Sequence, residues 1–213
     1  MRIHPEGWPW IGAALTTGLL SLALRRRTAG GLALLAAMGF AFFFRDPDRH
    51  PPNPCSDLVL SPADGTIVTL QRQAEPDWLQ DERAWRIGIF LSIFDVHINR
   101  FPVTGKVVRM THYPGAFRPA FEEDVWKRNE RQVFRLEDEQ GRRILMVQIA
   151  GLVARRTVAW VKPGQRLTCG ERFGLIRFGS RMEIFLPGSA RILTAPGQKV
   201  RAGETPLALL GNP

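Results

Sequence analysis

The amino-acid sequence predicts a mainly β protein, a single barrel-like or sandwich-like domain with a few short helices, preceded by an N-terminal hydrophobic helical hairpin. Two observations predict this fold class. Residues 8–24 and 29–44 form two uncharged apolar runs, whereas the chain beyond residue 54 alternates between short apolar stretches and clusters of Gly, Pro and Asp. Long apolar runs are typical of helices that meet lipid, and short runs bounded by turn residues are typical of strands.

The hairpin is expected over residues 1–44. Its two apolar runs, Trp8 to Leu24 and Ala29 to Phe44, are separated by three arginines, Arg25 to Arg27. Each run is slightly shorter than the ~20 residues of a spanning helix. Both are apolar on all faces, whereas a soluble helix normally keeps a polar stripe. We therefore expect a membrane-associated hairpin. A buried core hairpin is the alternative, and a signal peptide is disfavoured because the acidic Glu6 precedes the first run.

Residues 45–213 are expected to form the β domain. A proline-rich segment, residues 45–54, ends the hairpin. Four apolar stretches bounded by Gly, Pro and Asp are expected as strands: Leu58–Leu60, Gly65–Leu70, Arg86–Ile93 and Ile144–Ile149. The charged segment Ala120–Glu130 is the best candidate for a helix.

A weak internal repeat lies near the end of the chain. Pro163-Gly-Gln-Arg-Leu-Thr-Cys-Gly-Glu171 recurs 33 residues later as Pro196-Gly-Gln-Lys-Val-Arg-Ala-Gly-Glu204. Paired glycine turns around a short strand suit small barrels and sandwiches. The alternative is two unrelated turns of similar chemistry.

The chain is basic. Its net charge is +9, and the first 44 residues hold four basic side chains and one acidic, which leaves +6 for residues 45–213. A basic body indicates an anionic partner, either nucleic acid or a membrane surface. The hairpin favours the membrane, and we expect no nucleic acid. The only two cysteines, Cys55 and Cys169, are far apart and lack metal-ligand spacing. We therefore expect no disulfide framework, no metal and a reducing compartment.

Three polar residues stand out in the β domain. Asp64 lies in Ser61-Pro-Ala-Asp-Gly65, where a simple turn is the alternative to a function. His97 follows an apolar strand and is either a structural histidine or a general acid or base. Ser180 follows Gly179 inside a strand-like run, where a bulge would also explain the glycine. Their order permits an acid–base–nucleophile set, and the missing Gly-x-Ser-x-Gly elbow disfavours an α/β-hydrolase.

These stretches, together with Arg128-Asn-Glu-Arg131 and the position of Phe178-Gly-Ser180, resemble the short form of the phosphatidylserine decarboxylase family over residues 45–213. The resemblance implies a proenzyme that cleaves itself between Gly179 and Ser180, giving chains 1–179 and 180–213. Ser180 attacks the Gly179 carbonyl to form an ester, β-elimination from that ester leaves dehydroalanine, and the dehydroalanine hydrolyses to a pyruvoyl group and ammonia. That ketone forms a Schiff base with the substrate amine and accepts the electrons left by CO2. The product is phosphatidylethanolamine, and the pyruvoyl group is the only cofactor.

Carried over by resemblance, Asp64 and His97 assist self-cleavage or decarboxylation. Longer family members have a second histidine three positions after the first, where this chain has Arg100. His97 therefore serves both steps, or His112 supplies the second imidazole, and Arg100 is a candidate for holding the lipid phosphate. The implied partners are phosphatidylserine in an anionic membrane and the cleaved chain 180–213. An ether lipid with a serine head group and a homo-oligomeric state are both left open.

The resemblance also places the catalytic domain on the cytoplasmic face of the cell (inner) membrane. A spanning hairpin would then leave the three arginines outside, against the positive-inside tendency, whereas a hairpin within one leaflet would not. Two other functions remain open from the residues alone. One is a membrane-tethered serine hydrolase using Asp64, His97 and Ser180, and the other is a non-catalytic β adaptor or carrier domain.

Overall fold

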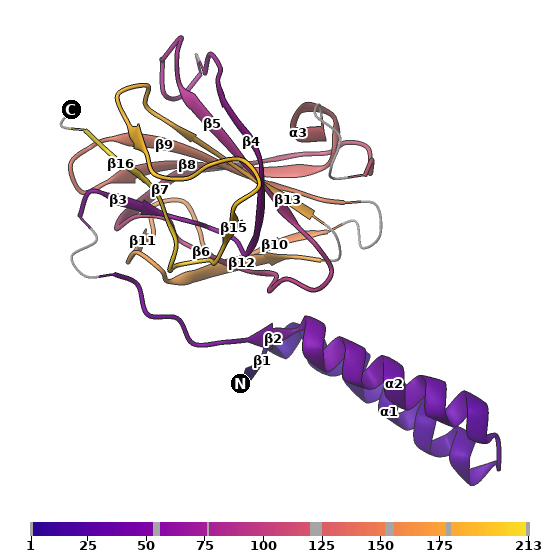
Figure 1. The fold of residues 1–213 in the computed structure, drawn as a ribbon. Coiled ribbons are helices and arrows are strands. Elements are labelled where there is room, and N and C mark those ends of the chain that lie inside the picture. Colours follow the sequence, from indigo (N-terminus) through magenta and orange to yellow (C-terminus); the bar gives the residue numbers. More distant parts are fainter. Residues whose placement is uncertain are drawn as a thin grey trace. The chain divides into compact units, whose positions relative to one another are not determined.

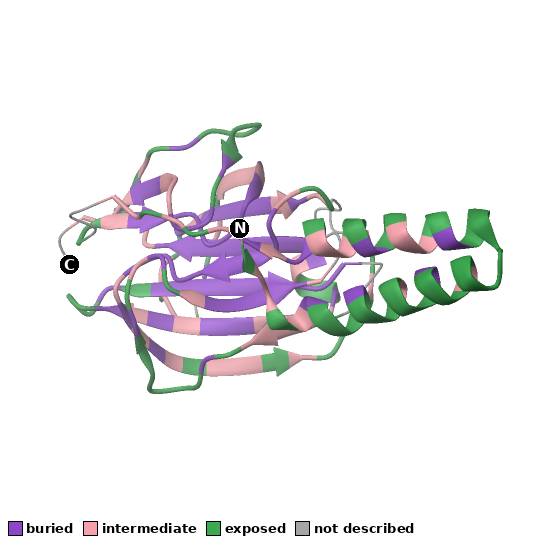
Figure 2. Cartoon of the chain, turned by 90° about the horizontal axis from the view of Figure 1, so that it is seen from below, coloured by how far each residue is buried: buried purple, intermediate pink, exposed green. Residues whose placement is uncertain are grey.

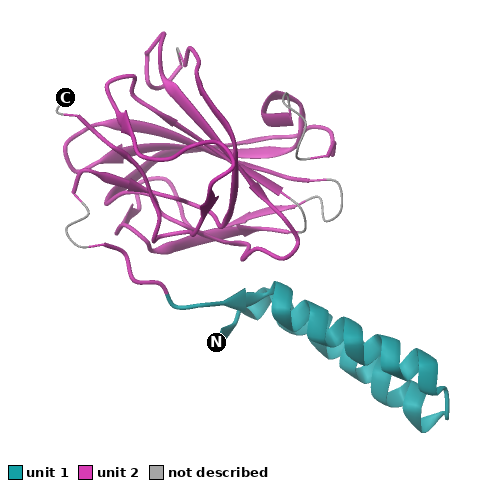
Figure 3. Ribbon diagram, in the orientation of Figure 1, with its two compact units in different colours: residues 1–48 teal, residues 49–213 magenta. Residues whose placement is uncertain are grey.

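The structure, a computed structural model, describes residues 2–52, 56–75, 77–119, 125–151, 156–177 and 180–211. The chain divides into two compact units, residues 1–48 and 49–213 (Figure 3). The first unit is helical and the second is built almost entirely of strands (Figure 1). The expected mainly β fold behind a helical hairpin is thereby confirmed.

The first unit is a helical hairpin. A short 3-10 turn, η1 (Pro5–Gly7), leads into α1 (Trp8–Ala23), and α2 (Arg27–Phe43) returns beside it. The two helices pack closely at Gly18 and Gly30, where a Cβ on either glycine would touch the carbonyl oxygen of the other. Two short strands, β1 (Arg2–Ile3) and β2 (Arg45–Asp46), pair at the open end.

Most large apolar side chains of the hairpin are exposed (Figure 2). They include Trp8, Trp10, Leu19, Leu20, Leu24, Leu32, Leu35 and Met38. α1 has 16 residues and α2 has 17, and among the described residues no helix is long and apolar enough to cross a membrane.

The second unit is organised around an eight-stranded antiparallel sheet. Its strand order is β11-β7-β8-β9-β13-β5-β4-β15. The bounds are β4 (Gly65–Arg72), β5 (Trp85–Leu91), β7 (Gly105–Tyr113), β8 (Arg131–Asp138), β9 (Arg143–Ile149), β11 (Arg166–Leu167), β13 (Ser180–Leu186) and β15 (Lys199–Val200). β13 is central, because it pairs with β5 on one side and β9 on the other.

Two three-stranded sheets complete the sandwich. One has the order β10-β12-β6 and the other β14-β16-β3. Their bounds are β3 (Leu58–Leu60), β6 (Ile98–Arg100), β10 (Thr157–Ala159), β12 (Arg172–Ile176), β14 (Arg191–Ile192) and β16 (Pro206–Leu209). The main core lies between the large sheet and these two, since it joins Ile89 and Ile184 of the large sheet to Phe173 and Leu207 of the small ones. A smaller apolar cluster covers the opposite face of the large sheet and includes Trp126 of the short helix α3 (Val125–Arg128).

The expected strands match the observed ones closely, with one difference at β5. That strand ends at Leu91, because Ser92 and the residues after it turn towards β6. Part of the expected helix Ala120–Glu130 falls on described residues, and there a helix is present. α3 covers Val125–Arg128, residues 120–124 lie outside the described part, and Asn129 forms an isolated bridge.

The two repeated Pro-Gly turns are structurally equivalent. Gly164 and Gly197, at the second position of each copy, have φ of +86° and +84°. The last glycines also match, because Gly170 N–H donates to the Phe101 carbonyl and Gly203 N–H donates to the Ser61 carbonyl, both at 2.8 Å. β11 and β15, inside the two copies, form the two edges of the eight-stranded sheet. The alternative of two unrelated turns is therefore wrong.

A second repeat escaped the sequence analysis. Ser61-Pro-Ala-Asp-Gly65 corresponds to Phe101-Pro-Val-Thr-Gly105, and the two segments exchange hydrogen bonds, from Leu60 N–H to the Pro102 carbonyl and from Arg100 N–H to the Pro62 carbonyl, both 2.9 Å. The sandwich thus has two related halves around an internal pseudo-twofold axis. In this relation Asp64 occupies the position of Thr104.

Cys169, in the first of the repeated turns, is disulfide-bonded. Cys55, the only other cysteine of the chain, lies outside the described residues. A disulfide at Cys169 goes against the expected absence of a disulfide framework, and the inference of a reducing compartment loses its basis.

Candidate active site

Ser180 is the first residue of β13 and is completely buried. It pairs with Leu91, the last residue of β5. Within the described residues no group hydrogen-bonds to its Oγ. A buried hydroxyl normally has a partner, because leaving one unsatisfied costs about 1–3 kcal/mol. The orphaned Oγ therefore marks Ser180 as a candidate reactive group. Gly179, the other half of the expected cleavage pair, lies outside the described residues.

His97 is held by the turn that connects β5 to β6. Its Nδ1 lies 2.9 Å from the backbone carbonyl oxygen of Asp95, and its side chain is buried. A carbonyl can only accept, so Nδ1 carries the hydrogen in the neutral ring and Nε2 carries the lone pair. His97 can therefore act as a base through Nε2.

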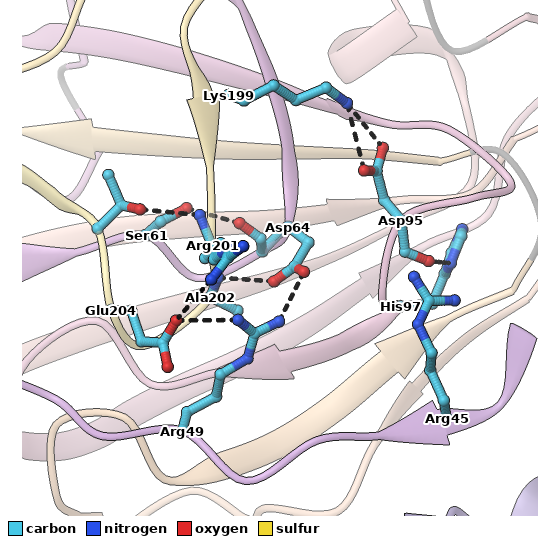
Figure 4. Close-up of polar contacts among 12 residues, drawn as sticks. Arg45, Arg49, Ser61, Asp64, Asp95, His97, Lys199, Arg201, Ala202 and Glu204 are labelled. Atoms are coloured by element: carbon cyan, nitrogen blue, oxygen red, sulfur yellow. Dashed lines mark hydrogen bonds and ion pairs between the residues drawn. The ribbon is translucent and has the colours of Figure 1, made fainter. Parts of the chain in front are cut away.

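The turn is closed by the Asp95 carboxylate. Figure 4 shows this carboxylate facing Lys199 and the Asp95 carbonyl facing the His97 ring. The carboxylate accepts from the Ser92 N–H at 2.9 Å and the Ser92 hydroxyl at 2.7 Å, and it pairs with Lys199 at 3.2 Å. Burial acts to raise the pKa of Asp95, but the hydrogen bonds from Ser92 and Lys199 outweigh it and hold that pKa below its ordinary value. Asp95 thus stays ionised and fixes the carbonyl that orients His97.

Two backbone contacts bring Ser180 and His97 to the same end of the sandwich. The Ile176 N–H, at the end of β12, donates to the His97 carbonyl at 3.3 Å. Ser180, four residues further on, is registered against Leu91, just before the His97 turn. Ile176 and Ser180 are therefore both held against the segment that carries His97.

An amide pair lies in the interior near Ser180. Gln148 is registered against Met182, so it shares a face of the large sheet with Ser180 as a diagonal neighbour. Its Nε2 donates to the Asn99 Oδ1 at 2.8 Å, and both residues are fully buried. Within the described residues, Asn99 Nδ2 and Gln148 Oε1 have no hydrogen-bond partner. The interior next to Ser180 therefore holds an unused donor and an unused acceptor.

Asp64 is not part of this cluster. Its Oδ2 accepts from Arg49 at 2.7 Å, and its Oδ1 accepts from the Ala202 N–H at 2.8 Å (Figure 4). Arg49 also pairs with Glu204 at 2.9 Å. Burial raises the pKa of Asp64, and the Ala202 N–H and Arg49 offset only part of that rise. Asp64 therefore ties the linker to the C-terminal turn, and the structure joins it to Arg49 rather than to His97.

The other two candidates lie apart from Ser180. Arg100 follows Asn99 in β6, so it points to the opposite face, where it donates to the Gly170 carbonyl at 2.9 Å and lines an open hollow of about 460 Å³. His112 is exposed on β7, which is three strands from β13 in the sheet order. At about 4.8 Å per strand this is roughly 14 Å.

Several residues of this region escaped the sequence analysis. Asp95 left a signal, since serine followed three residues later by an acidic residue is typical of a self-capped turn. Asn99, Gln148 and Arg49 left none, because their partners are distant in sequence. Asn129, from the Arg128–Arg131 motif, donates to the carbonyls of Arg118 and Ala150 at 2.9 Å and supports the end of β9.

The chain is thus a mainly β sandwich that buries a serine hydroxyl without a described partner at the same end as a hydrogen-bonded histidine. Comparison with known proteins gives the family. The model of the phosphatidylserine decarboxylase family matches residues 37–208. The chain belongs to this family.

Curated relatives agree over nearly the whole chain. A phosphatidylserine decarboxylase proenzyme of Symbiobacterium thermophilum is 44% identical over 209 residues, covering 98% of this chain and 95% of the relative. That of Syntrophus aciditrophicus is 40% identical, covering 96% of each chain. That of Beijerinckia indica is 45% identical, covering 97% of this chain and 88% of the relative.

Proposed function

We propose that this protein decarboxylates phosphatidylserine to phosphatidylethanolamine, using a pyruvoyl group that it makes by cleaving itself between Gly179 and Ser180. The observation that carries the proposal is the buried Ser180 Oγ, which has no hydrogen-bond partner among the described residues. Family membership and the proenzyme names of the relatives support it.

Self-cleavage begins with attack of Ser180 Oγ on the Gly179 carbonyl carbon. A serine hydroxyl is weakly nucleophilic, so a base must take its proton, and His97 Nε2 is the candidate. The Gly179–Ser180 amide becomes an ester, and the freed amine belongs to Ser180. Loss of the Ser180 α-proton then expels the Gly179 carboxylate and leaves dehydroalanine. Water replaces its nitrogen, which leaves as ammonia, so that chain 180–213 begins with a ketone.

The ketone supplies an acceptor for the substrate amine and for the electrons released with CO2. The chain's own residues do the rest. Asn99 Nδ2 is a donor suited to the substrate carboxylate, because a charged acceptor strengthens such a hydrogen bond. His97 supplies the proton that replaces CO2. Leu91 and Met182, next to Ser180, belong to the main apolar core, and this apolar surrounding keeps water away from the Ser180 end of the sandwich.

The serine hydrolase alternative is less well supported. A triad needs a carboxylate on the histidine nitrogen opposite the nucleophile. Asp64 is engaged by Arg49 and Ala202, and His97 Nδ1 faces the Asp95 carbonyl. A non-catalytic adaptor would not explain a buried serine hydroxyl left without a partner.

We further propose that residues 1–44 attach the enzyme to its lipid. The exposed apolar side chains of α1 and α2 support this, because water disfavours a surface of that kind. The catalytic unit would then act at the face of the cell membrane that holds the serine lipid.

Intact mass and gel analysis of the purified protein test the proposal. Wild type should give chains 1–179 and 180–213, the second modified by a ketone-specific aminooxy reagent. Ser180→Ala should remain one chain and release no CO2. Ser189→Ala, at an exposed serine of the same segment, is the matched control and should be processed normally. Wild-type protein that is active as one intact chain would refute the proposal, and labelling of Ser180 by a fluorophosphonate without cleavage would favour the hydrolase.

A further inference from the structure

The turn between β5 and β6 presents two large apolar side chains to solvent. Ile93 is 52% exposed and Phe94 is 70% exposed. Among the large apolar side chains described for residues 49–213, Phe94 is the most exposed. Single exposed apolar residues are common, but two neighbouring ones at the tip of a turn form a compact apolar projection.

The tip is held in place by hydrogen bonds. The Asp95 carboxylate binds both the N–H and the hydroxyl of Ser92, and the Asp95 N–H donates to the Ser92 carbonyl at 3.0 Å. These bonds close the turn around Ile93 and Phe94. They fix the backbone on either side of Ile93 and Phe94, which the structure leaves 52% and 70% exposed.

The tip borders the candidate active site on both sides in sequence. Leu91, two residues before Ile93, is registered against Ser180. His97 is three residues after Phe94, and its ring is bonded to the carbonyl of Asp95 in the same turn. A phosphatidylserine molecule carries its reacting carboxylate only a head group away from its acyl chains. An enzyme that takes such a substrate gains if its active site lies close to the lipid surface.

The charge beside the tip suits an anionic surface. Lys199, with its side chain 66% exposed, is paired with Asp95 of the turn at 3.2 Å. Arg201, two residues further along the chain and 73% exposed, lies 4.0 Å from Glu204. Apolar side chains flanked by exposed basic ones are the usual composition of a surface that enters the interface of an anionic bilayer.

From this geometry we infer that the Ile93–Phe94 tip inserts into the surface of the anionic bilayer and presents the Ser180–His97 end of the sandwich to the lipid head groups. The inference rests on the proposed function. It adds a second membrane contact, made by the catalytic unit itself and separate from the hairpin, whose occupant is the lipid bilayer.

A kinetic comparison tests the inference with the full-length, matured enzyme. Phe94→Ser and the control Leu193→Ser, at a 40% exposed leucine of the same unit, are assayed on two substrates. One is a short-chain phosphatidylserine below its micellar concentration, and the other is long-chain phosphatidylserine in vesicles. Phe94→Ser should lower kcat/KM on vesicles about tenfold, the lower end expected for the loss of one buried aromatic side chain, and leave the rate on the monomeric substrate unchanged. Leu193→Ser should match wild type on both.

A spectroscopic test does not depend on activity. Phe94→Cys and Leu193→Cys are labelled with an environment-sensitive fluorophore, with wild type labelled in parallel as background, and bound to vesicles containing brominated lipids. The label at residue 94 should be quenched by the lipids and the label at 193 should not. Equal quenching at both positions, or equal loss of activity of Phe94→Ser on both substrates, would overturn the inference. A wild type without CO2 release on either substrate would instead refute the proposed function, and the quenching would still test the tip.

Discussion

Glu183 lies at the centre of a buried charge cluster on the outer face of the large sheet. Its carboxylate accepts from Arg86 Nη2 at 2.9 Å, from Arg86 Nε at 3.1 Å and from Arg181 Nε at 2.6 Å. Glu183 is fully buried, and both arginines are at least 98% buried. Glu183 and Arg181 belong to the segment 180–213, whereas Arg86 belongs to the segment before the proposed cleavage point, so the cluster joins the two chains after maturation.

Glu183→Gln should therefore destabilise the protein strongly. Removing one partner of a buried ion pair leaves an uncompensated charge and typically costs about 3–5 kcal/mol. For a protein of this size the melting temperature should fall by roughly 6–20 °C. Thermal unfolding followed by circular dichroism, at fixed detergent concentration, measures the shift. Glu204→Gln is the control, because the Glu204 side chain is 27% exposed and a partly exposed pair contributes about 1 kcal/mol or less.

A small shift would refute this reasoning. If Glu183→Gln and Glu204→Gln melt within a degree or two of one another, the buried carboxylate does not balance the two guanidinium groups. If Glu183→Gln does not mature, the comparison is made on the unprocessed Ser180→Ala background, where cleavage is not required.

Two further predictions concern the candidate site. His97→Ala should lower CO2 release by at least about a hundredfold, because this is the usual contribution of a positioned acid or base. His112→Ala is the control and should retain nearly full activity. The reverse result would show that His112 supplies the imidazole. Asp64→Asn tests the raised pKa of Asp64. A raised carboxyl pKa contributes stability that is present below its ordinary value of 3.8 and is lost as pH rises through the folded-state pKa. Relative to Asp64→Asn, wild type should therefore lose stability in urea unfolding as pH rises from about 3.5 to 7, and a relative gain would contradict the sign.

Much of the fold follows from local sequence pattern. The strand β9 (Arg143–Ile149) was predicted to within one residue, because an apolar stretch between turn residues leaves few alternatives. The Pro-Gly turns at Gly164 and Gly197 were visible because their positive φ values require glycine or a close substitute. The second repeat, which relates Ser61–Gly65 to Phe101–Gly105, was not recognised in the sequence. Asp64 in the first segment corresponds to Thr104 in the second, and these two side chains share only an acceptor oxygen.

The candidate site was predictable in part. Ser180 and His97 were found through short motifs, and the structure places them at one end of the sandwich. The amide pair of Asn99 and Gln148 was not found, because its members lie 49 residues apart and neither has a local signature. Asp64 was assigned to the same site as His97 from chain order and from the family resemblance. Order cannot distinguish a carboxylate that orients an imidazole from one that is held by an arginine.

The internal pseudo-symmetry relates Ser180, the proposed reactive serine, to a structural arginine in the other half of the sandwich. Arg142, just before β9, corresponds to Ser180, the first residue of β13. The Asp138 N–H donates to the Arg142 carbonyl at 3.1 Å, and Leu91, the counterpart of Asp138, is registered against Ser180. In the first half the polar side chain is fully engaged, because Arg142 binds the carboxylate of Asp138 at 2.6 Å and further acceptors around it. In the second half the equivalent Ser180 hydroxyl is buried without a partner among the described residues. The same backbone frame therefore supports a hydrogen-bonded structural group in one half and, in the other, a buried hydroxyl without a described partner, as the proposed role of Ser180 requires.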